Sequence, residues 1–127
     1  MSLTTPGLRA YEFSIRSDVA ELVSQLRELL GAQLVAYLGS VTETRAVRQW
    51  ADGVRKPPAE VARRLRLAYQ VAGLLAERDQ PPVVQAWFQG MNPQLEDIAP
   101  ARLIREGNPD EIGPRVLAAA RAFAAIG

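Results

Sequence analysis

Apolar residues recur every three or four positions along this chain, in short runs that glycine and proline interrupt. The first clear run consists of Val19, Leu22, Val23, Leu26, Leu29 and Leu30. This spacing places one apolar stripe along a helix. Asp18, three residues before Glu21, fits an N-terminal capping box, and Gly31 fits a C-terminal cap. The pattern continues along the rest of the chain without a convincing sheet, so an all-α protein is expected.

The same spacing predicts the later helices. They are expected over residues 32–38, 43–52, 59–78 and 82–89, from about Pro100 to Gly107, and from Asn108 through the C-terminal region. Thr42 is a good N-cap for the helix that follows it, and Asn108 for the last helix. Pro114 lies inside that last pattern, so the regular helix is expected to begin or kink there.

Residues 1–16 lack a sustained helical period and are expected to form a mobile or partly extended arm. Within them, apolar and polar residues alternate over positions 11–16, which fits a short strand or a packed arm. Residues 17–78 and 79–127 then form two helical units. The turn at residues 79–82 is too short for a flexible linker, so the two units are expected to pack together.

The stretch 59–78 carries an unusually broad apolar face. Its central stripe is Val61, Leu65, Ala68, Ala72 and Leu75, and Leu67, Val71 and Leu74 widen it. A face of this breadth is expected to contact two partners, for example both halves of the chain or a second subunit.

Cysteine and histidine are both absent from the chain. Their absence excludes a disulfide scaffold, a thiolate metal site and a cysteine nucleophile, and removes the commonest acid–base group at neutral pH. Two adjacent carboxylate pairs, Glu96-Asp97 and Asp110-Glu111, are poor acid–base candidates because neighbours on a helix do not face each other. We therefore expect a non-enzymatic protein without cofactor or metal.

No apolar run reaches the ~18 residues of a membrane span and no signal peptide is visible, so a cytoplasmic protein is expected.

The formal net charge of +1 conceals an uneven distribution. Residues 1–44 carry three arginines against five acidic residues, and residues 67–127 carry five against seven. Residues 45–66 carry seven cations against two acidic residues, a net +5. A local basic stripe is the electrostatic footprint of phosphate binding, although a solvated face of basic helices has the same composition.

Residues 33–57 combine a helix, a glycine-containing turn, a second helix and a basic segment, which is typical of a DNA-binding helix-turn-helix. The second helix of such a motif enters the major groove, where Arg recognises guanine and Gln recognises adenine. The residues expected in the groove are Thr44, Arg45, Arg48 and Gln49. The residues expected at phosphates are Thr42, at the helix N-terminus, and Arg55, Lys56, Arg63 and Arg64. An ordinary helical hairpin with a basic rim is the alternative.

The segment from Val47 to Pro57, VRQWADGVRKP, resembles the end of the recognition helix in Xre-type, Cro/repressor-like helix-turn-helix proteins. The second half of the chain resembles the toxin-binding domain of the Xre/MbcA/ParS antitoxin family. The matching residues are Trp87-Phe88, Met91 to Leu95, Pro100 to Ile104, Gly107 and Val116. The likeness covers roughly residues 18–127 and is carried by the order and spacing of these residues.

This resemblance implies an antitoxin with an N-terminal helix-turn-helix packed on a small C-terminal toxin-binding domain. Such proteins bind and block a RES-domain toxin, an enzyme that degrades NAD or transfers ADP-ribose, and bind double-stranded DNA at their own promoter. The residues that the resemblance places at or near the toxin are Asn92, Arg115, Arg121, Phe123 and Ile126. Paired DNA half-sites imply a homodimer.

Two other functions stay open from the sequence. The first is a stand-alone Xre-family transcriptional regulator whose second half serves only dimerisation. The second is a helical adaptor that binds proteins and uses its basic segment as a solvated face. Core packing also explains Trp87, Phe88 and Leu103 without any partner, whereas exposure of Phe123 or Ile126 would indicate an interface.

Overall fold

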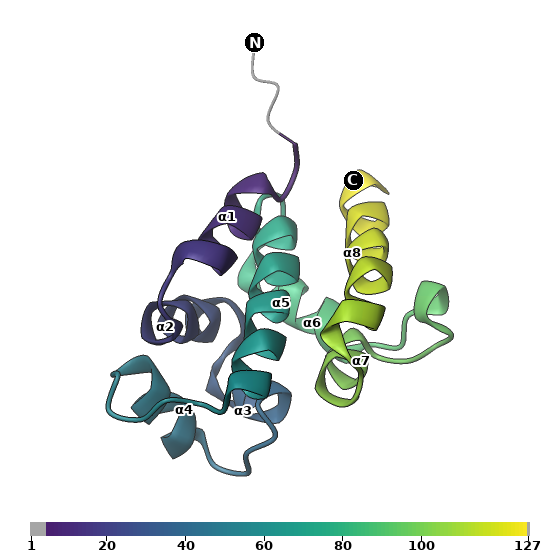
Figure 1. Ribbon diagram of the computed structural model, residues 1–127. Helices are drawn as coiled ribbons and strands as arrows, with labels where there is room; N and C mark the ends of the chain where they lie inside the picture. The colour runs from purple at the N-terminus through teal and green to yellow at the C-terminus, as the bar shows by residue number, and fades with distance from the viewer. Residues whose placement is uncertain (1–4, 127) are drawn as a thin grey trace.

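The computed structural model describes residues 5–126, most of which lie in helices (Figure 1). The helices are α1 (Leu8–Arg16), α2 (Val19–Leu30), α3 (Ala32–Leu38), α4 (Thr44–Ala51), α5 (Ala59–Ala76), α6 (Pro81–Gln89), α7 (Pro100–Glu106) and α8 (Pro109–Ile126), with a 3-10 turn at Pro93–Leu95. Among these residues the only β-type pairing is a single bridge between Asn92 and Ile98. The predicted all-α class is confirmed. No helix in this range is long and apolar enough to cross a membrane.

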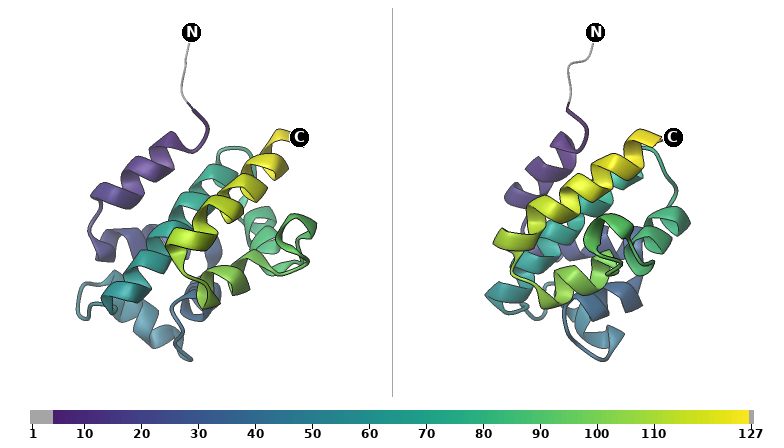
Figure 2. Two further views of the ribbon diagram at one scale, coloured as in Figure 1. Left: turned by 45° about the vertical axis from the view of Figure 1, so that its right-hand side comes forward. Right: turned by 90° about the vertical axis from the view of Figure 1, so that its right-hand side faces the viewer.

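Helix α5 is the centre of the fold. α1 and α2 pack on one side of it, and α8 lies along another (Figure 1, Figure 2). Leu65, Ala68, Val71 and Ala72 of α5 are completely shielded from solvent. The broad apolar face predicted for residues 59–78 is therefore covered by helices of the same chain. Its breadth no longer argues for a second subunit.

The apolar core is continuous across the predicted boundary at residue 79. α6 packs on α2, α7 packs on α3, and α8 packs on α5. Val84, Phe88, Ile104 and Val116 of the second half belong to the same buried cluster as the residues of α2 to α5. The expectation that the two halves pack together is confirmed, and the two predicted units share one core.

Capping residues set several helix ends where the sequence placed them. Asp18 Oδ1 accepts a hydrogen bond from the Glu21 N–H at 2.8 Å at the start of α2. Asn108 Oδ1 accepts one from the Asp110 N–H at 2.9 Å at the start of α8. α8 therefore begins before Pro114 and includes it, so the expected start at Pro114 is wrong. Pro114 has no N–H, so the carbonyl oxygen of Asp110, four residues earlier, lacks its helical hydrogen bond. Asp110 is exposed, and water can bind this oxygen instead.

Residues 8–16 form a helix, so the predicted arm or short strand is wrong for this part of the chain; residues 1–4 lie outside the described residues. The helix buries Ala10 and Ser14, which are too small or too polar to give an apolar periodicity. A Cβ placed on Gly73 of α5 would lie 2.5 Å from the Cβ of Ala10. Two helices can approach this closely only where glycine faces a small residue, and the sequence pattern did not reveal that pairing.

Polar contacts fix both ends of α1 to α5. The Gly7 N–H donates to Glu77 Oε2 at 2.8 Å. At the other end, Arg66 Nη1 donates to the carbonyl oxygens of Ser14 and Ser17, at 2.6 and 3.0 Å. Arg66 belongs to the basic segment 45–66, and its guanidinium holds the last turn of α1, where the carbonyls have no helical partner.

Candidate nucleic-acid interface

The turn between α3 and α4 is held tightly against the core. The Val41 N–H donates to the Ala36 carbonyl oxygen at 3.0 Å, and Ser40 adopts a left-handed conformation with φ of 57°. Gly39 lies directly on the Trp50 indole, because a Cβ at this position would come within 2.8 Å of the ring. The absence of a side chain at Gly39 therefore lets the turn lie flat on α4.

The inner face of α4 consists of Ala46, Val47 and Trp50, all of which are buried. They pack α4 against α2 and α3. Trp50 is 1% exposed, and its indole N–H has no hydrogen-bond partner in the part of the chain that the structure describes. Apolar packing of the Trp50 ring therefore holds α4 in place, without help from a hydrogen bond of its N–H.

The outer face of α4 carries the four residues expected in the groove. Thr44, Arg45 and Arg48 are exposed and Gln49 is partly exposed, on the side opposite the buried residues. The structure therefore brings the predicted groove residues together on one solvent-facing surface. A helix reading DNA would need its side chains arranged in this way.

Thr42 is exposed in the turn, and the prediction that it caps α4 is wrong. The N-cap is Glu43, whose side chain makes no capping hydrogen bond, and α4 starts at Thr44. The turn is one residue longer than the sequence suggested, so Thr42 falls outside the first helical turn. Thr42 still lines the hollow in front of α4.

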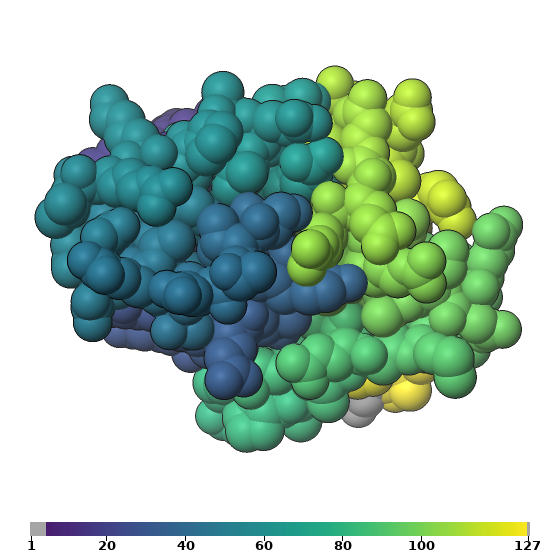
Figure 3. All heavy atoms as spheres, turned by 90° about the horizontal axis from the view of Figure 1, so that it is seen from below, coloured from purple at the N-terminus to yellow at the C-terminus, as the bar shows by residue number. Residues whose placement is uncertain are grey.

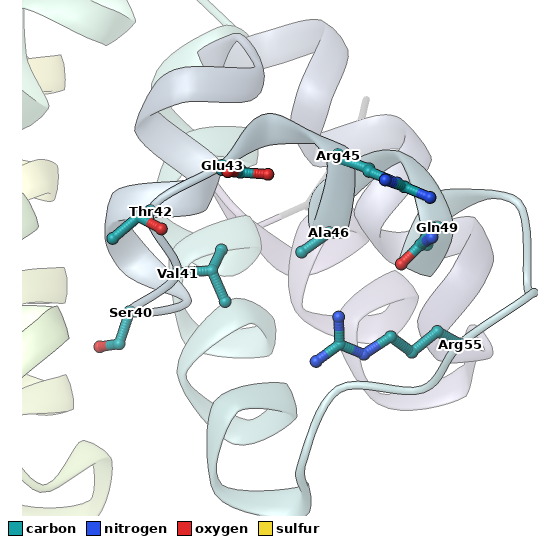
Figure 4. Close-up of a pocket in the computed structure, with 8 residues that line it drawn as sticks. All are labelled: Ser40, Val41, Thr42, Glu43, Arg45, Ala46, Gln49 and Arg55. Carbon is teal, nitrogen blue, oxygen red and sulfur yellow. The ribbon is translucent and has the colours of Figure 1, made fainter.

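The loop after α4 folds back beneath the helix. The N–H groups of Val54 and Arg55 both donate to the Gln49 carbonyl oxygen, at 3.0 and 3.3 Å. Figure 4 shows the Arg55 side chain reaching back towards the turn, below Ala46 and Gln49. Arg55 thus lines, with the turn and α4, a hollow of about 500 Å³. Lys56 follows in the same exposed loop.

Arg63 and Arg64, the other two predicted phosphate contacts, are engaged within the chain. Arg63 forms an ion pair with Asp110 at the start of α8, at 2.8 Å. Arg64 pairs with Glu60 at 3.1 Å, and its side chain is only 16% exposed. Glu60 and partial burial hold Arg64 along α5, whereas the Arg63 side chain is 49% exposed and its pair with Asp110 lies on the surface.

The cations of the basic segment therefore differ in whether they are paired within the chain. Among residues 5–126, none of the ion pairs involves Arg45, Arg48, Arg55 or Lys56. Free cations on one surface can neutralise phosphates without first breaking internal pairs. Seen from below, residues of the α3–α4 turn and the start of α5 form one continuous face (Figure 3). No group of three acidic side chains in the described residues could hold a metal ion on it.

The predicted toxin-contacting residues do not all share one surface. Asn92 Oδ1 accepts a hydrogen bond from the Gln94 N–H at 2.9 Å, so this side chain shapes the 3-10 turn. Arg115 and Arg121 are exposed on α8. Arg121 lies two positions before Phe123, and residues at this spacing point to opposite sides of a helix.

Apolar side chains are exposed where α6 meets the end of α8. Phe123 is 37% exposed and Ile126 is 82% exposed. The centroid of the Phe123 ring lies 6.4 Å from that of buried Trp87 on α6. Val83, one helical turn before Trp87, is exposed. We call Val83, Phe123 and Ile126 the α6–α8 apolar patch. Trp87 and its neighbour Phe88 belong mainly to the core, as the core-packing interpretation expected.

Arg78 anchors the end of α8 that carries this patch. Its guanidinium donates to the carbonyl oxygen of Ala124. The contact joins the end of α5 to the last turn of α8, whose carbonyls have no helical partner. Phe123 and Ile126 of the patch are therefore presented by a helix end that is tied to the residues following α5.

Sequence reasoning missed two contributors to the α4 surface. The first is Gly39, since nothing in the spacing of Gly39 and Trp50 indicates that they touch. The second is Arg105 of α7, which lines a hollow next to Thr42 and Arg45 although it is about 60 positions away in sequence. Only the packing of α7 on α3 brings it there.

Comparisons with protein-family models, with curated proteins and with solved structures found no match to this chain. The arrangement of α3, α4 and the loop that follows them is therefore the basis on which a function can be argued.

Proposed function

We propose that the protein is a DNA-binding regulator that uses α3 and α4 as a helix-turn-helix. The observation that carries this proposal is the surface of α4 and its following loop, where Arg45, Arg48, Arg55 and Lys56 form no ion pair with any residue between 5 and 126. α4 is braced through Trp50 and presents polar residues that can bind base edges. The surrounding cations supply the phosphate contacts that fix the register on DNA.

The proposal includes the role of an antitoxin. The resemblance of the second half to the Xre/MbcA/ParS family supports it, and so does the α6–α8 apolar patch, since exposed apolar groups mark interfaces. In this role the chain is a cytoplasmic, non-enzymatic homodimer that represses its own promoter and blocks a RES-domain toxin. The catalytic activity of the system then belongs to the toxin.

DNA binding is expected to depend steeply on salt. Each neutralised phosphate contributes about −0.9 to the slope of log affinity against log salt, so the four free cations imply roughly −3 to −4 for each bound chain. Fluorescence anisotropy with a labelled duplex of the upstream region, over a range of salt concentrations, measures this slope. A flat dependence, or no binding at low salt, would contradict the proposal and favour a protein-binding adaptor.

Changing the exposed patch is expected to abolish toxin neutralisation while DNA binding is retained. The double variant Phe123→Ser and Ile126→Ser should lower toxin affinity ten-fold or more, since loss of an interface anchor costs about 2 kcal/mol. Co-expression with the RES-domain enzyme encoded beside this chain, read out as growth and cellular NAD, tests this. Truncation after residue 107 is unsuitable because it removes Val116 and Ala120 from the core.

The matched control is the double variant Leu8→Ser and Ile15→Ser on α1. It also replaces two exposed apolar residues, on another element of the fold. Equal loss of neutralisation in both double variants would count against the α6–α8 apolar patch. If the neighbouring reading frame encodes no RES-type enzyme, the stand-alone regulator, which depends on the same α4 surface, becomes the better proposal.

A further inference from the structure

Arg105 connects the second half of the chain to the α4 surface. It lies in the last turn of α7, and its Cζ is 4.5 Å from the centroid of the Tyr37 ring on α3. Tyr37 precedes the α3–α4 turn by two residues. The contact therefore places a cation of α7 beside the element that positions α4.

Arg105 and Arg45 lie along one hollow of about 740 Å³. Tyr37, Thr42 and Glu43 line the same hollow. In the view from below, the atoms of α3 and the α3–α4 turn meet those at the end of α7 and the start of α8 on the same face (Figure 3). Two cations and one carboxylate, Glu43, line it, so the hollow attracts anions.

Stacking on Tyr37 leaves the guanidinium able to bind a phosphate. The guanidinium lies over the ring and carries five N–H donors, so donors that do not face the ring stay available to a phosphate. Among residues 5–126, Arg105 takes part in no ion pair, while Arg102 on the same helix pairs with Glu106 at 3.2 Å. The stacked side chain is also held in place before binding, which lowers the entropy lost on contact.

We propose that Arg105 is a phosphate contact that extends the DNA interface onto the second half of the chain. The inference rests on the proposed DNA-binding function. DNA that lies along α4 carries one phosphate row past the α3–α4 turn, and Arg105 stands at that edge of the surface. The second half then takes part in DNA binding as well as in any contact made by the α6–α8 apolar patch.

The test compares Arg105→Ala and Arg105→Gln with Arg102→Ala, which removes the same charge from the same helix. Binding of a labelled duplex of random sequence is measured by anisotropy over a range of salt concentrations. Both Arg105 variants should weaken binding about five-fold at low salt and reduce the salt slope by about 0.9. Arg102→Ala should leave the salt slope unchanged and lower affinity only slightly, through the weaker overall attraction of the chain to DNA. Circular dichroism and thermal unfolding confirm that each variant is folded.

The Tyr37→Leu variant separates the role of the Tyr37 ring, which positions Arg105, from the role of the Arg105 charge. It keeps an apolar side chain under Arg105 but removes the aromatic face, so affinity should fall by less than in Arg105→Ala while the salt slope stays the same. If the wild-type chain binds duplex DNA and the Arg105 variants match Arg102→Ala, the inference is overturned and the proposed function stands. If the wild-type chain binds no duplex, the proposed function itself fails.

Discussion

The double variant Arg45→Ala and Arg48→Ala is expected to lose specific binding to its operator and to keep toxin neutralisation. Both side chains are exposed on α4 and neither is in an ion pair within the described residues, so their removal leaves the fold intact. A bidentate base contact contributes about 1–3 kcal/mol, so losing two costs about 2–6 kcal/mol, or at least roughly thirty-fold in affinity. Mobility-shift titration of the operator duplex measures this loss.

The control for this pair is Arg9→Ala with Arg16→Ala. These two arginines are exposed on α1, so the variant changes the net charge by the same amount away from α4. It should lower operator affinity only slightly, through the weaker overall attraction of the chain to DNA. Unchanged affinity in the Arg45 and Arg48 variant would show that α4 does not enter the groove.

The variant Trp50→Ala is expected to be the most destabilising single change in the α3–α4 region. Trp50 is fully packed and supports Gly39 in the turn as well as α4 itself. Truncation of a buried tryptophan to alanine costs about 3–5 kcal/mol, a large share of the stability of a domain of this size. Urea unfolding followed by circular dichroism measures the change, and DNA binding should be lost together with the folded state.

Trp50→Phe serves as its partner variant. It retains an aromatic ring in the core, and it breaks no hydrogen bond because the indole N–H has no partner. The cost should therefore be well below that of Trp50→Ala, and the α4 surface should still bind DNA. Equal destabilisation by the two variants would mean that a hydrogen bond of the indole, and not its packing, holds α4.

Most of the helices could be predicted because their buried residues are large, apolar and regularly spaced. Asp18 and Asn108 marked two helix starts correctly, since a side-chain cap is a local interaction. α1 could not be found in this way, because its contact with α5 depends on Ala10 facing Gly73. Such a pairing is long-range and involves residues with almost no hydrophobic signal.

In the candidate site, too, the features set by local spacing could be predicted and those set by long-range packing could not. The exposed face of α4 followed from helical spacing, which also separated Arg45 and Arg48 from buried Val47. The engagement of Arg63 with Asp110 did not, because it depends on how α8 packs against α5. A count of basic residues in the sequence therefore does not tell which cations are paired within the chain.

The central position of α5 has a consequence for how the protein responds to proteolysis. Helices from both ends of the chain cover this one helix, so neither half can keep its core without the other. If proteolytic cleavage in the short connection between α5 and α6 separated the two halves, each would expose the apolar face that it buries against the other. The α4 surface and the α6–α8 apolar patch would then be lost together.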